Sequence, residues 1–267
     1  MPRKLLFALL ATLAFCTLQA QEFWMMPDKF QYEKGDTIRV RFNLGENFIG
    51  ETWNLRPERI GTVSLHTTSA TSDLKAGALP GRSTHLKVPA VREGTYLITM
   101  EGENAFVELP AGRFNEYLKE HALDNVARLR EETNATDQPG REMYRRITKL
   151  IVQVGDTPDD TYKKNTGLPL DIIPEKHPAT MKKGDLVQFK ILFNGKPDFG
   201  ARAYVWNNKD NKVFMQPVYS QKDGTIDVRI FNDGDWMISV VKMIQVSNPK
   251  ADWQSFWGSL VFQVKEE

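Results

Sequence analysis

The sequence predicts a mainly β protein in which two antiparallel β-sandwich domains, immunoglobulin-like or prealbumin-like, are separated by a helical insert. Three observations predict this class. Apolar and polar residues alternate in short runs, turn residues separate the runs, and the second half of the chain repeats features of the first. Hydrophobic residues are 41% of the chain and charged residues 26%, as in folded globular proteins.

The first twenty residues have the pattern of a secretory signal peptide. Arg3 and Lys4 provide a basic start, residues 5–17 are apolar, and a short exit sequence precedes the expected cleavage after Ala20. The apolar run is shorter than the roughly 20 residues that span a bilayer. We therefore expect a periplasmic mature chain that does not span a membrane.

The mature chain is expected to lack cysteine and to be almost neutral. The only cysteine, Cys16, lies in the expected signal peptide, which predicts no disulfide and no thiolate site. Phe15 precedes it where a lipoprotein signal has a small residue, so ordinary cleavage is favoured over lipidation. Removing residues 1–20 changes the formal net charge from +1 to −1, which is not the basic balance of a nucleic-acid-binding protein.

Two landmarks of the first half recur in the second. Residues 34–42 and 183–191 both begin with Lys-Gly-Asp and continue as an alternating run, and residues 94–99 resemble residues 234–239. Gly-Asp is common in turns before strands, so coincidence is the alternative. The preserved order favours an internal duplication, in which Tyr96 and Trp236 occupy equivalent inward positions.

The second half shows its strands most clearly. Turns rich in asparagine, aspartate and glycine separate six alternating runs, as in a sandwich of short strands. The runs are Leu186–Phe193, Ala201–Trp206, Val213–Val218, Ile226–Phe231, Trp236–Met243 and Ser259–Val264. Hairpin turns explain the acidic residues better than calcium loops, because the alternating oxygen ligands of a calcium loop are missing.

Between the halves, residues 113–147 are expected to form the helical insert. The apolar residues of 114–132 fall near one stripe of a helix, and a second short helix is expected over residues 141–147 before a strand at 150–154. Residues 156–167 are the expected linker. The predicted domains are therefore a signal peptide at 1–20 and sandwiches at 21–155 and 168–267.

Basic residues gather in and after the second expected helix. They are Arg141, Arg145, Arg146 and Lys149. Such a cluster could hold phosphate or an acidic partner, although a solvated helix surface with charges of both signs is the commoner explanation.

The sequence contains none of the compact signatures of catalysis that we sought, so we expect no enzyme. It has no nucleophile elbow, no His-Glu-x-x-His motif and no phosphate-binding glycine loop. The four histidines, His66, His85, His121 and His177, are too scattered to predict a metal site. A carboxylate pair of a carbohydrate-active enzyme stays open, because only a structure shows the separation of two carboxyl groups.

Most of the candidate binding residues lie at the start of the expected mature chain. The candidate ligand-binding residues are Gln21, Glu22, Trp24, Met25, Met26, Lys242 and Met243. Thioethers, including that of Met215, could bind a soft ion such as Cu(I), but methionine also fills irregular gaps in a core. Trp253, Phe256 and Trp257 likewise either line a groove or close the end of a sandwich.

Short stretches that follow one another in a particular order over nearly the whole mature chain carry a family resemblance. They include Glu-Phe-Trp-Met-Met-Pro at 22–27, then residues 45–48, 114–118, 139–146, Lys149, 154–155, Leu-Pro-Leu-Asp-Ile-Ile-Pro at 168–174, and residues 194–197, 234–236, 252–253 and 256–257. Together they resemble a bacterial periplasmic domain family of unknown function, often described as an accessory component of cobalt or nickel uptake. The resemblance implies a two-part β-rich envelope protein without established catalysis.

Two departures from the family pattern concern metal binding. Many members begin the mature chain with histidine and carry histidine before the methionine that corresponds to Met243, whereas this chain has Gln21 and Lys242. An amide and an ammonium group are poor ligands for Ni(II) and Co(II). We therefore expect no cofactor and weak binding of these ions.

The leading functional hypothesis is a non-enzymatic periplasmic binding or accessory protein, associated with transition-metal uptake. Its expected partner is a membrane permease or receptor component. The alternative is an envelope protein-interaction module that docks along a sheet edge or on the helical insert. A carbohydrate-active enzyme is the third hypothesis.

Overall fold

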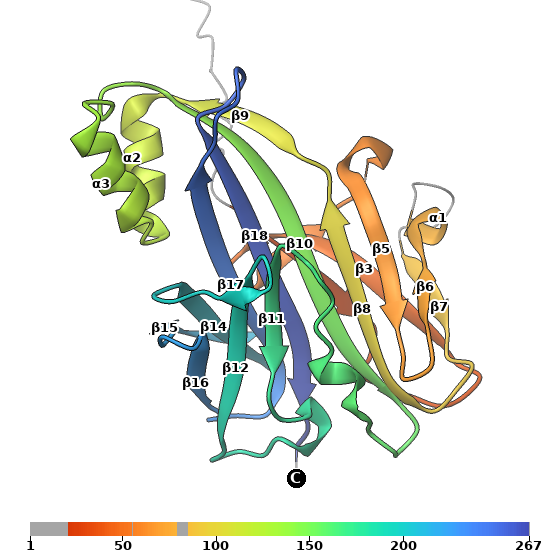
Figure 1. Cartoon of the computed structure of the whole chain (residues 1–267). Helices are drawn as coiled ribbons and strands as arrows, with labels where there is room; N and C mark the ends of the chain where they lie inside the picture. The colour runs from red at the N-terminus through yellow and green to blue at the C-terminus, as the bar shows by residue number, and fades with distance from the viewer. Residues whose placement is uncertain (1–20, 55, 79–84, 267) are drawn as a thin grey trace, which may run out of the picture.

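The computed structural model describes residues 21–54, 56–78 and 85–266, so the expected signal peptide and its cleavage site after Ala20 lie outside the described residues. In these ranges the strands form one large sheet and two small ones (Figure 1). The order of the central sheet is β15 (Lys212–Tyr219), β14 (Arg202–Lys209), β17 (Gly234–Gln245), β18 (Trp253–Val264), β10 (Gly140–Val154), β8 (Gly94–Gly102), β5 (Ile60–His66) and β6 (Thr71–Asp73), with β2 (Gln31–Tyr32) and β9 (Ala105–Leu109) also paired to β10.

Each small sheet is centred on one long strand. The first contains β1 (Glu22–Pro27), β3 (Thr37–Glu46), β4 (Ile49–Thr52) and β7 (Leu86–Pro89), and the second contains β11 (Leu170–Pro174), β12 (Leu186–Phe193), β13 (Lys196–Pro197) and β16 (Thr225–Arg229). The helices of the described residues are α1 (Lys75–Ala78), α2 (Ala111–Glu120) and α3 (Asp124–Glu132), with short 3-10 turns at Pro57–Arg59, Asp160–Lys163 and Pro178–Thr180. The prediction of a mainly β protein with two sandwiches is confirmed.

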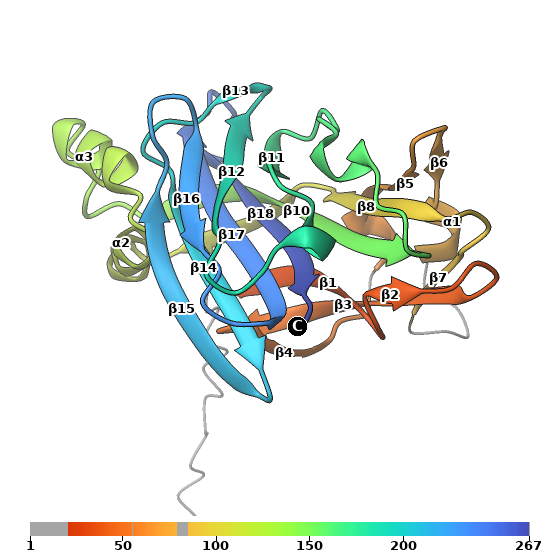
Figure 2. The ribbon, with the colours of Figure 1, turned by 90° about the horizontal axis from the view of Figure 1, so that it is seen from below.

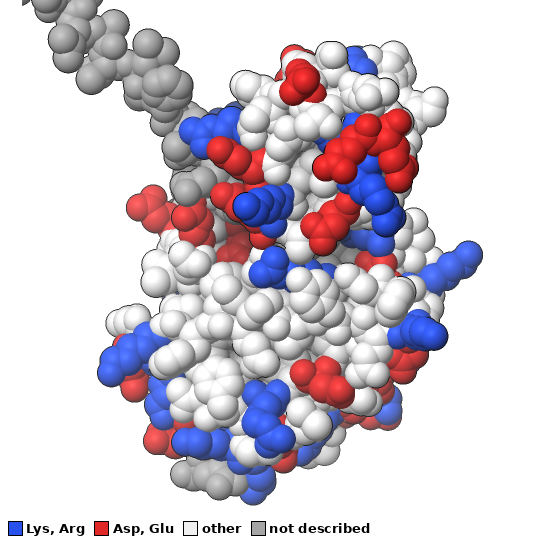
Figure 3. Space-filling view, turned by 90° about the vertical axis from the view of Figure 1, so that its left-hand side faces the viewer, with Lys and Arg blue, Asp and Glu red and all other residues white. Residues whose placement is uncertain are grey.

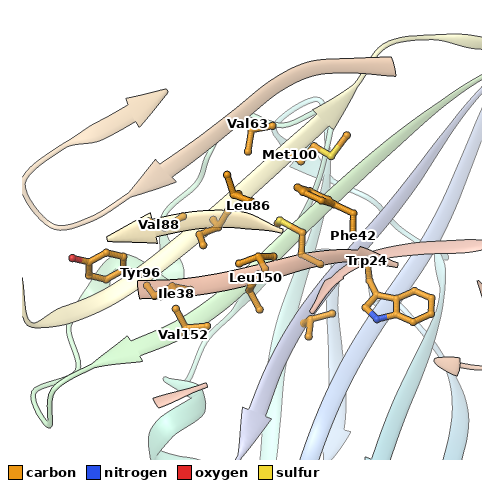
Figure 4. Packing of buried hydrophobic residues seen from close by; sticks show 14 of the residues in the cluster. Trp24, Ile38, Phe42, Val63, Leu86, Val88, Tyr96, Met100, Leu150 and Val152 are labelled. Carbon is orange, nitrogen blue, oxygen red and sulfur yellow. The ribbon is translucent and has the colours of Figure 1, made fainter. Parts of the chain in front are cut away.

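The two small sheets pack on opposite faces of the central sheet (Figure 2). Leu150 and Val152 of β10 belong to the core beneath the first small sheet, whereas Ile147 and Ile151 of the same strand belong to the core beneath the second. Successive side chains of a strand point to opposite faces. Alternate residues of β10 therefore stabilise two different sandwiches, and Figure 4 shows the first of these cores.

The pairing of β10 with β18 explains why opposite faces are covered. The order β6-β5-β8-β10 from one edge of the sheet corresponds to the order β15-β14-β17-β18 from the other edge. The two innermost strands, β10 and β18, pair parallel, with Ile147 beside Gly258. A twofold axis relating two parallel neighbours lies in the sheet along the strands, and such an axis exchanges the two faces. Duplicated halves joined in this way must cover opposite faces.

The expected duplication is visible in backbone conformation. Gly35 and Gly184, which precede β3 and β12, have φ of 99° and 98°, and Gly94 and Gly234, which begin β8 and β17, have φ of 127° and 102°. Positive φ is a conformation in which glycine escapes the steric cost of a side chain. The glycines that recur in the two halves therefore occupy turns of the same conformation.

The aspartates after the first pair of glycines are also used alike. The Asp36 carboxylate accepts from Lys29 Nζ at 2.8 Å, and that of Asp185 accepts from Lys176 Nζ at 2.5 Å. Both lysines lie two positions after the last residue of the neighbouring strand, which is β1 in one half and β11 in the other. An equivalent lysine–aspartate ion pair therefore stabilises the same corner of both small sheets.

Tyr96 and Trp236 lie in equivalent strands, as the duplication predicts. Tyr96 of β8 belongs to the first core and Trp236 of β17 to the second, and their exposed fractions are 1% and 0%. Both face inward, each toward its own small sheet.

The second helix expected over residues 141–147 is wrong, because this segment is the start of β10. It pairs with β9 on one side and with β18 on the other, so its backbone is satisfied within the sheet. Its charged residues hid the strand alternation. Glu142 is buried beneath α2, where it accepts hydrogen bonds from Tyr117 and Ser255. A charged residue of this segment therefore lies inside the protein and not on the solvated face of a helix.

The expected linker, residues 156–167, packs against β8 of the central sheet and against the second core. The Asp159 carboxylate accepts from the backbone N–H of Thr95 at 2.9 Å, and Tyr162 is buried in the second core. The division into domains at 21–155 and 168–267 stays a prediction. Within the described residues, no helix has the length and apolarity needed to cross a membrane.

Candidate functional site

A cavity of about 250 Å³ opens beside the first small sheet and is the strongest candidate site. The strands β1, β3, β8 and β10 and the segment after β4 supply its walls. Its lining residues are Phe23, Leu44, Trp53, Arg56, Arg59, Met100, Gly102, Glu103, Ala105, Tyr144 and Arg146. The volume is slightly below the usual range for sites of drug-sized ligands, about 300–1,000 Å³, and so suits a small molecule.

Arg146 of β10 contacts three of the aromatic rings that line this cavity. Its guanidinium carbon lies 5.7 Å from the ring centre of Phe23, 5.4 Å from that of Trp53 and 5.4 Å from that of Tyr144. The Phe23 and Trp53 rings meet edge to face at 5.4 Å. Cation–π contacts of this kind orient a guanidinium without neutralising its charge.

Arg146 differs from its basic neighbours in having no acidic partner. Arg141 pairs with Asp252, Arg145 with Glu101 and Lys149 with Asp171. Among the described residues, Arg146 has neither an ion pair nor a hydrogen bond from its side chain, and its contacts are the three aromatic rings. Of the four basic residues expected on a helix, Arg146 therefore keeps its guanidinium N–H groups available to bind an anion.

Two further arginines make the cavity positive. Arg56 and Arg59 line it together with Arg146, and among the described lining residues only Glu103 is acidic. The backbone N–H of Glu103 donates to the carbonyl of Arg59 at 3.0 Å, which fixes the turn that carries Arg59 to the end of β8.

The electrostatic surroundings of Arg146 favour an added negative charge. Burial lowers the pKa of Arg146, the nearby Tyr144 raises it, and the positive charge of Arg59 lowers it further. An arginine keeps its proton at neutral pH even so. The cost of holding two guanidinium groups close together falls when an anion binds between them.

The candidate residues at the start of the mature chain lie mostly in the first core. Met25 is fully buried, its backbone N–H donates to Thr148 Oγ1 at 3.2 Å, and the Trp24 ring packs edge to face on Phe48 at 5.6 Å. Met26 packs against this core and Gln21 is partly exposed. Burial raises the pKa of Glu22 to about 7, while a hydrogen bond from Ser239 at 3.1 Å opposes the shift.

The structure does not bring Lys242 and Met243 to these residues. Met243 is buried in a separate core beneath α2 and α3. Lys242 points to the opposite face of β17, where its Nζ pairs with Asp198 at 2.5 Å and lies 5.5 Å from the Phe193 ring centre. The thioethers of Met25 and Met243 therefore belong to different cores, and the ligand-binding role of this residue set stays a prediction.

The other aromatic candidates occupy core positions. Trp253 is buried beneath the helical insert, Trp257 stacks on Tyr117 at 5.9 Å, and Phe256 lies in the second core. The described residues contain no group of three or more His, Cys, Asp or Glu side chains arranged to hold a metal ion.

Sequence reasoning missed most of the cavity. Trp53, Arg56 and Arg59 come from one short segment after β4, Tyr144 comes from β10, about 90 residues further along the chain, and none of the four belongs to a motif. The one usable signal was Arg146 in the basic cluster, because a run of basic residues predicts an anion site as one of its outcomes.

The chain belongs to a family described as a domain of unknown function, DUF4198, whose profile matches residues 18–243. No curated protein matches the chain. This agrees with the family resemblance in its coarser form, a domain family without an assigned function.

The similar solved structures are distant. The tetra-tandem repeat in the extending region of a large adhesion protein is 8% identical, with 92% of this chain and 50% of that chain covered and a TM-score of 0.23. A Salmonella alpha-2-macroglobulin mutant is 10% identical over 90% of this chain and 14% of that chain, with a TM-score of 0.23. The N-terminal domains of the bacteriophage RB49 highly immunogenic outer capsid protein are 11% identical over 90% and 59%, with a TM-score of 0.19.

The chain thus spans from 14% to 59% of the length of these structures. At such TM-scores the matches add nothing to the description of the fold.

Proposed function

We propose that this protein is a non-enzymatic binding protein of the bacterial periplasm whose ligand is a small organic anion with a flat apolar body. The observation that supports this function most directly is Arg146, a guanidinium held by three aromatic rings and left without a carboxylate partner in the described part of the chain. An aromatic carboxylate matches both features. Its charge pairs with the guanidinium groups and its ring fits between the aromatic walls.

Binding without turnover is favoured by the chemistry of the lining. Arginine holds its proton throughout the physiological range, so Arg56, Arg59 and Arg146 orient an anion but do not exchange protons with it. Periplasmic location follows from the expected signal peptide and is part of the proposal. Membership of the family lends no support to a link with cobalt or nickel uptake, and that link stays a prediction.

The test is calorimetric titration of the mature chain, residues 21–267, with benzoate and 4-hydroxybenzoate. Benzamide lacks the charge, cyclohexanecarboxylate lacks the flat ring, and inorganic phosphate lacks the apolar body. We expect the aromatic carboxylates to bind most tightly and Arg146→Met to weaken them at least tenfold, because a charged hydrogen bond contributes about 1.5–3 kcal/mol. Equal binding of benzamide and benzoate would refute the proposal.

Arg145→Met is the matched control. Arg145 is the adjacent residue of β10, faces the other side of the sheet and pairs with Glu101 at 2.5 Å. Its removal should leave carboxylate binding unchanged. A parallel titration with Ni(II) and Co(II) tests the metal hypothesis, for which we expect binding weaker than micromolar.

A further inference from the structure

The strand β15 is one edge of the central sheet, and β14, β17 and β18 separate it from β10, which lines the arginine cavity. Its exposed large side chains are Phe214, Met215 and Tyr219, with exposed fractions of 52%, 46% and 58%. Phe199, just before β14, is 66% exposed. Figure 3 faces the left-hand side of Figure 1, where β15 lies, and shows a broad band without charged side chains across this face.

The backbone of β15 is available for further pairing. A two-residue turn, Asp210-Asn211, with φ of 52° and 61°, joins β14 to β15, so Lys209 and Lys212 form the hydrogen-bonded pair that closes the hairpin. Pairs then alternate along the ladder. The residues opposite Asn208, Trp206, Tyr204 and Arg202 direct their backbone groups away from β14, and these are Val213, Met215, Pro217 and Tyr219.

Pro217 stands at one of these outward positions. It lacks only an N–H group that would have pointed away from the sheet, which is where an edge strand tolerates proline. Val213 and Met215 on one side of it and Tyr219 on the other keep both a donor and an acceptor. The edge thus retains most of the groups that an added strand would use.

The duplicated edge at the other end of the sheet provides an internal comparison. β6 occupies the place that corresponds to β15, but it has only three residues, Thr71, Ser72 and Asp73, all polar and exposed. A short, polar edge with a charge is the usual protection against unwanted pairing. The length and apolarity of β15 are therefore not a consequence of the duplication.

The charges at the ends of β15 indicate the partner. From Val213 to Gln221 the chain has no charged residue, and Lys212 and Lys222 bracket this run. Both lysines are exposed, and neither forms an ion pair with any residue that the structure describes. Acidic residues on a partner would complement both ends, whereas a second copy paired antiparallel would bring Lys212 of one copy toward Lys222 of the other.

We propose that β15 binds an extended segment of another protein, which adds as a further strand, carries uncharged apolar residues at alternate positions, and has acidic residues at both ends. Main-chain hydrogen bonds would provide the affinity of such an edge complex, and the side chains and flanking charges its specificity. The proposal rests on β15 alone and is independent of the ligand of the arginine cavity.

The probe is a fluorescent peptide of alternating valine and threonine, flanked at each end by two aspartates, and binding to the mature chain is measured by fluorescence anisotropy. A second peptide carries lysines in place of the aspartates. We expect the acidic peptide to bind at least tenfold more tightly. In the double variant Lys212→Glu with Lys222→Glu, this preference should reverse.

Two variants at Met215 separate the contribution of its backbone N–H to peptide binding from that of its side chain. Met215→Pro removes an outward N–H and should weaken the acidic peptide about tenfold beyond Met215→Ala, which keeps it. Leu186→Lys, at an exposed apolar residue of β12, is the control and should change nothing. Melting curves establish that each variant is folded.

Three outcomes would overturn the proposal. One is the absence of peptide binding. A second is binding that is insensitive both to the charge reversal and to Met215→Pro. The third is a concentration-dependent dimer in sedimentation that Met215→Lys abolishes, which would make a second copy the occupant.

Discussion

Lys149 of β10 and Asp171 of β11 form an ion pair with exposed fractions of only 1% for both side chains. The pair joins the central sheet to the second small sheet, and the other carboxylate oxygen of Asp171 accepts from Thr166 N and Oγ1 at 3.0 and 2.9 Å. Burial lowers the pKa of Lys149, and the adjacent Asp171 charge opposes this shift. Both residues belong to stretches that carry the family resemblance, and the structure gives them a shared place.

Removal of one partner of this pair should be more damaging than removal of both. Lys149→Met or Asp171→Leu alone leaves a buried charge and should cost about 3–5 kcal/mol, whereas an apolar replacement of both often costs little. Urea denaturation of the two single variants and the double variant measures the coupling. If the single costs simply add, the two side chains are not coupled in solution.

Stability should fall as the pH rises through the range in which Glu142 ionises. Burial raises the pKa of Glu142 from 4.5 to about 7, although hydrogen bonds from Ser255, Tyr117 and Trp257 oppose the shift. The folded protein therefore holds more protons than the unfolded chain between these values, and its stability decreases with rising pH. The contribution lost between pH 5 and pH 8 is about 2–3 kcal/mol at 1.36 kcal/mol per unit.

The variant Glu142→Gln isolates this effect. The difference in unfolding free energy between the parent and the variant should change by that amount between pH 5 and pH 8, in favour of the variant at high pH. The difference cancels the contributions of Glu22, whose pKa burial raises to about 7, and of His121, whose pKa burial lowers to about 4. A constant difference would mean that Glu142 titrates normally.

The same glycine-to-alanine change should have opposite signs at different places in the fold. Gly35 and Gly184 have open space where a Cβ would lie but φ near 99°, so Gly35→Ala and Gly184→Ala should each lose about 1–2 kcal/mol through backbone strain. Gly112 in α2 has equally open space without positive φ. Gly112→Ala should gain about 0.5–1 kcal/mol, and thermal unfolding of the three variants decides the comparison.

Tyr96 and Trp236 should contribute similarly to the two cores. Truncation of either to alanine is expected to cost about 3–5 kcal/mol. The Tyr96 hydroxyl contacts the backbone N and O of Arg92, each at 3.2 Å, so Tyr96→Phe should cost about 1 kcal/mol. An alanine variant that melts like the parent protein would show that the residue is not a core anchor.

The sequence by itself determined most strands of the second half and the duplication. Leu186–Phe193 was predicted with the bounds that β12 has, because its alternation is regular and a Gly-Asp turn precedes it. The Lys-Gly-Asp repeat predicted two equivalent turns, and the structure shows that they share their glycine conformation and also an ion pair. Local chemistry sufficed for these features, since alternation and positive φ depend on neighbouring residues only.

The tertiary structure decided what the charged residues of β10 do. From sequence, residues 141–147 resembled a solvated helix. In the fold, Glu142 is buried beneath α2, Lys149 pairs with Asp171, and Arg146 faces aromatic rings from β1 and the segment after β4. Partners that lie tens of residues away leave no periodic trace in the segment they contact.

The shared central sheet and the arginine cavity likewise required the fold. The parallel pairing of β10 with β18 joins strands separated by about a hundred residues, and it places the two sandwiches on opposite faces. Long-range pairing depends on the packing of whole sheets, whereas a sequence pattern records only which side of a strand is apolar. For that reason the sequence predicted two sandwiches, and only the structure showed that they are built on one sheet.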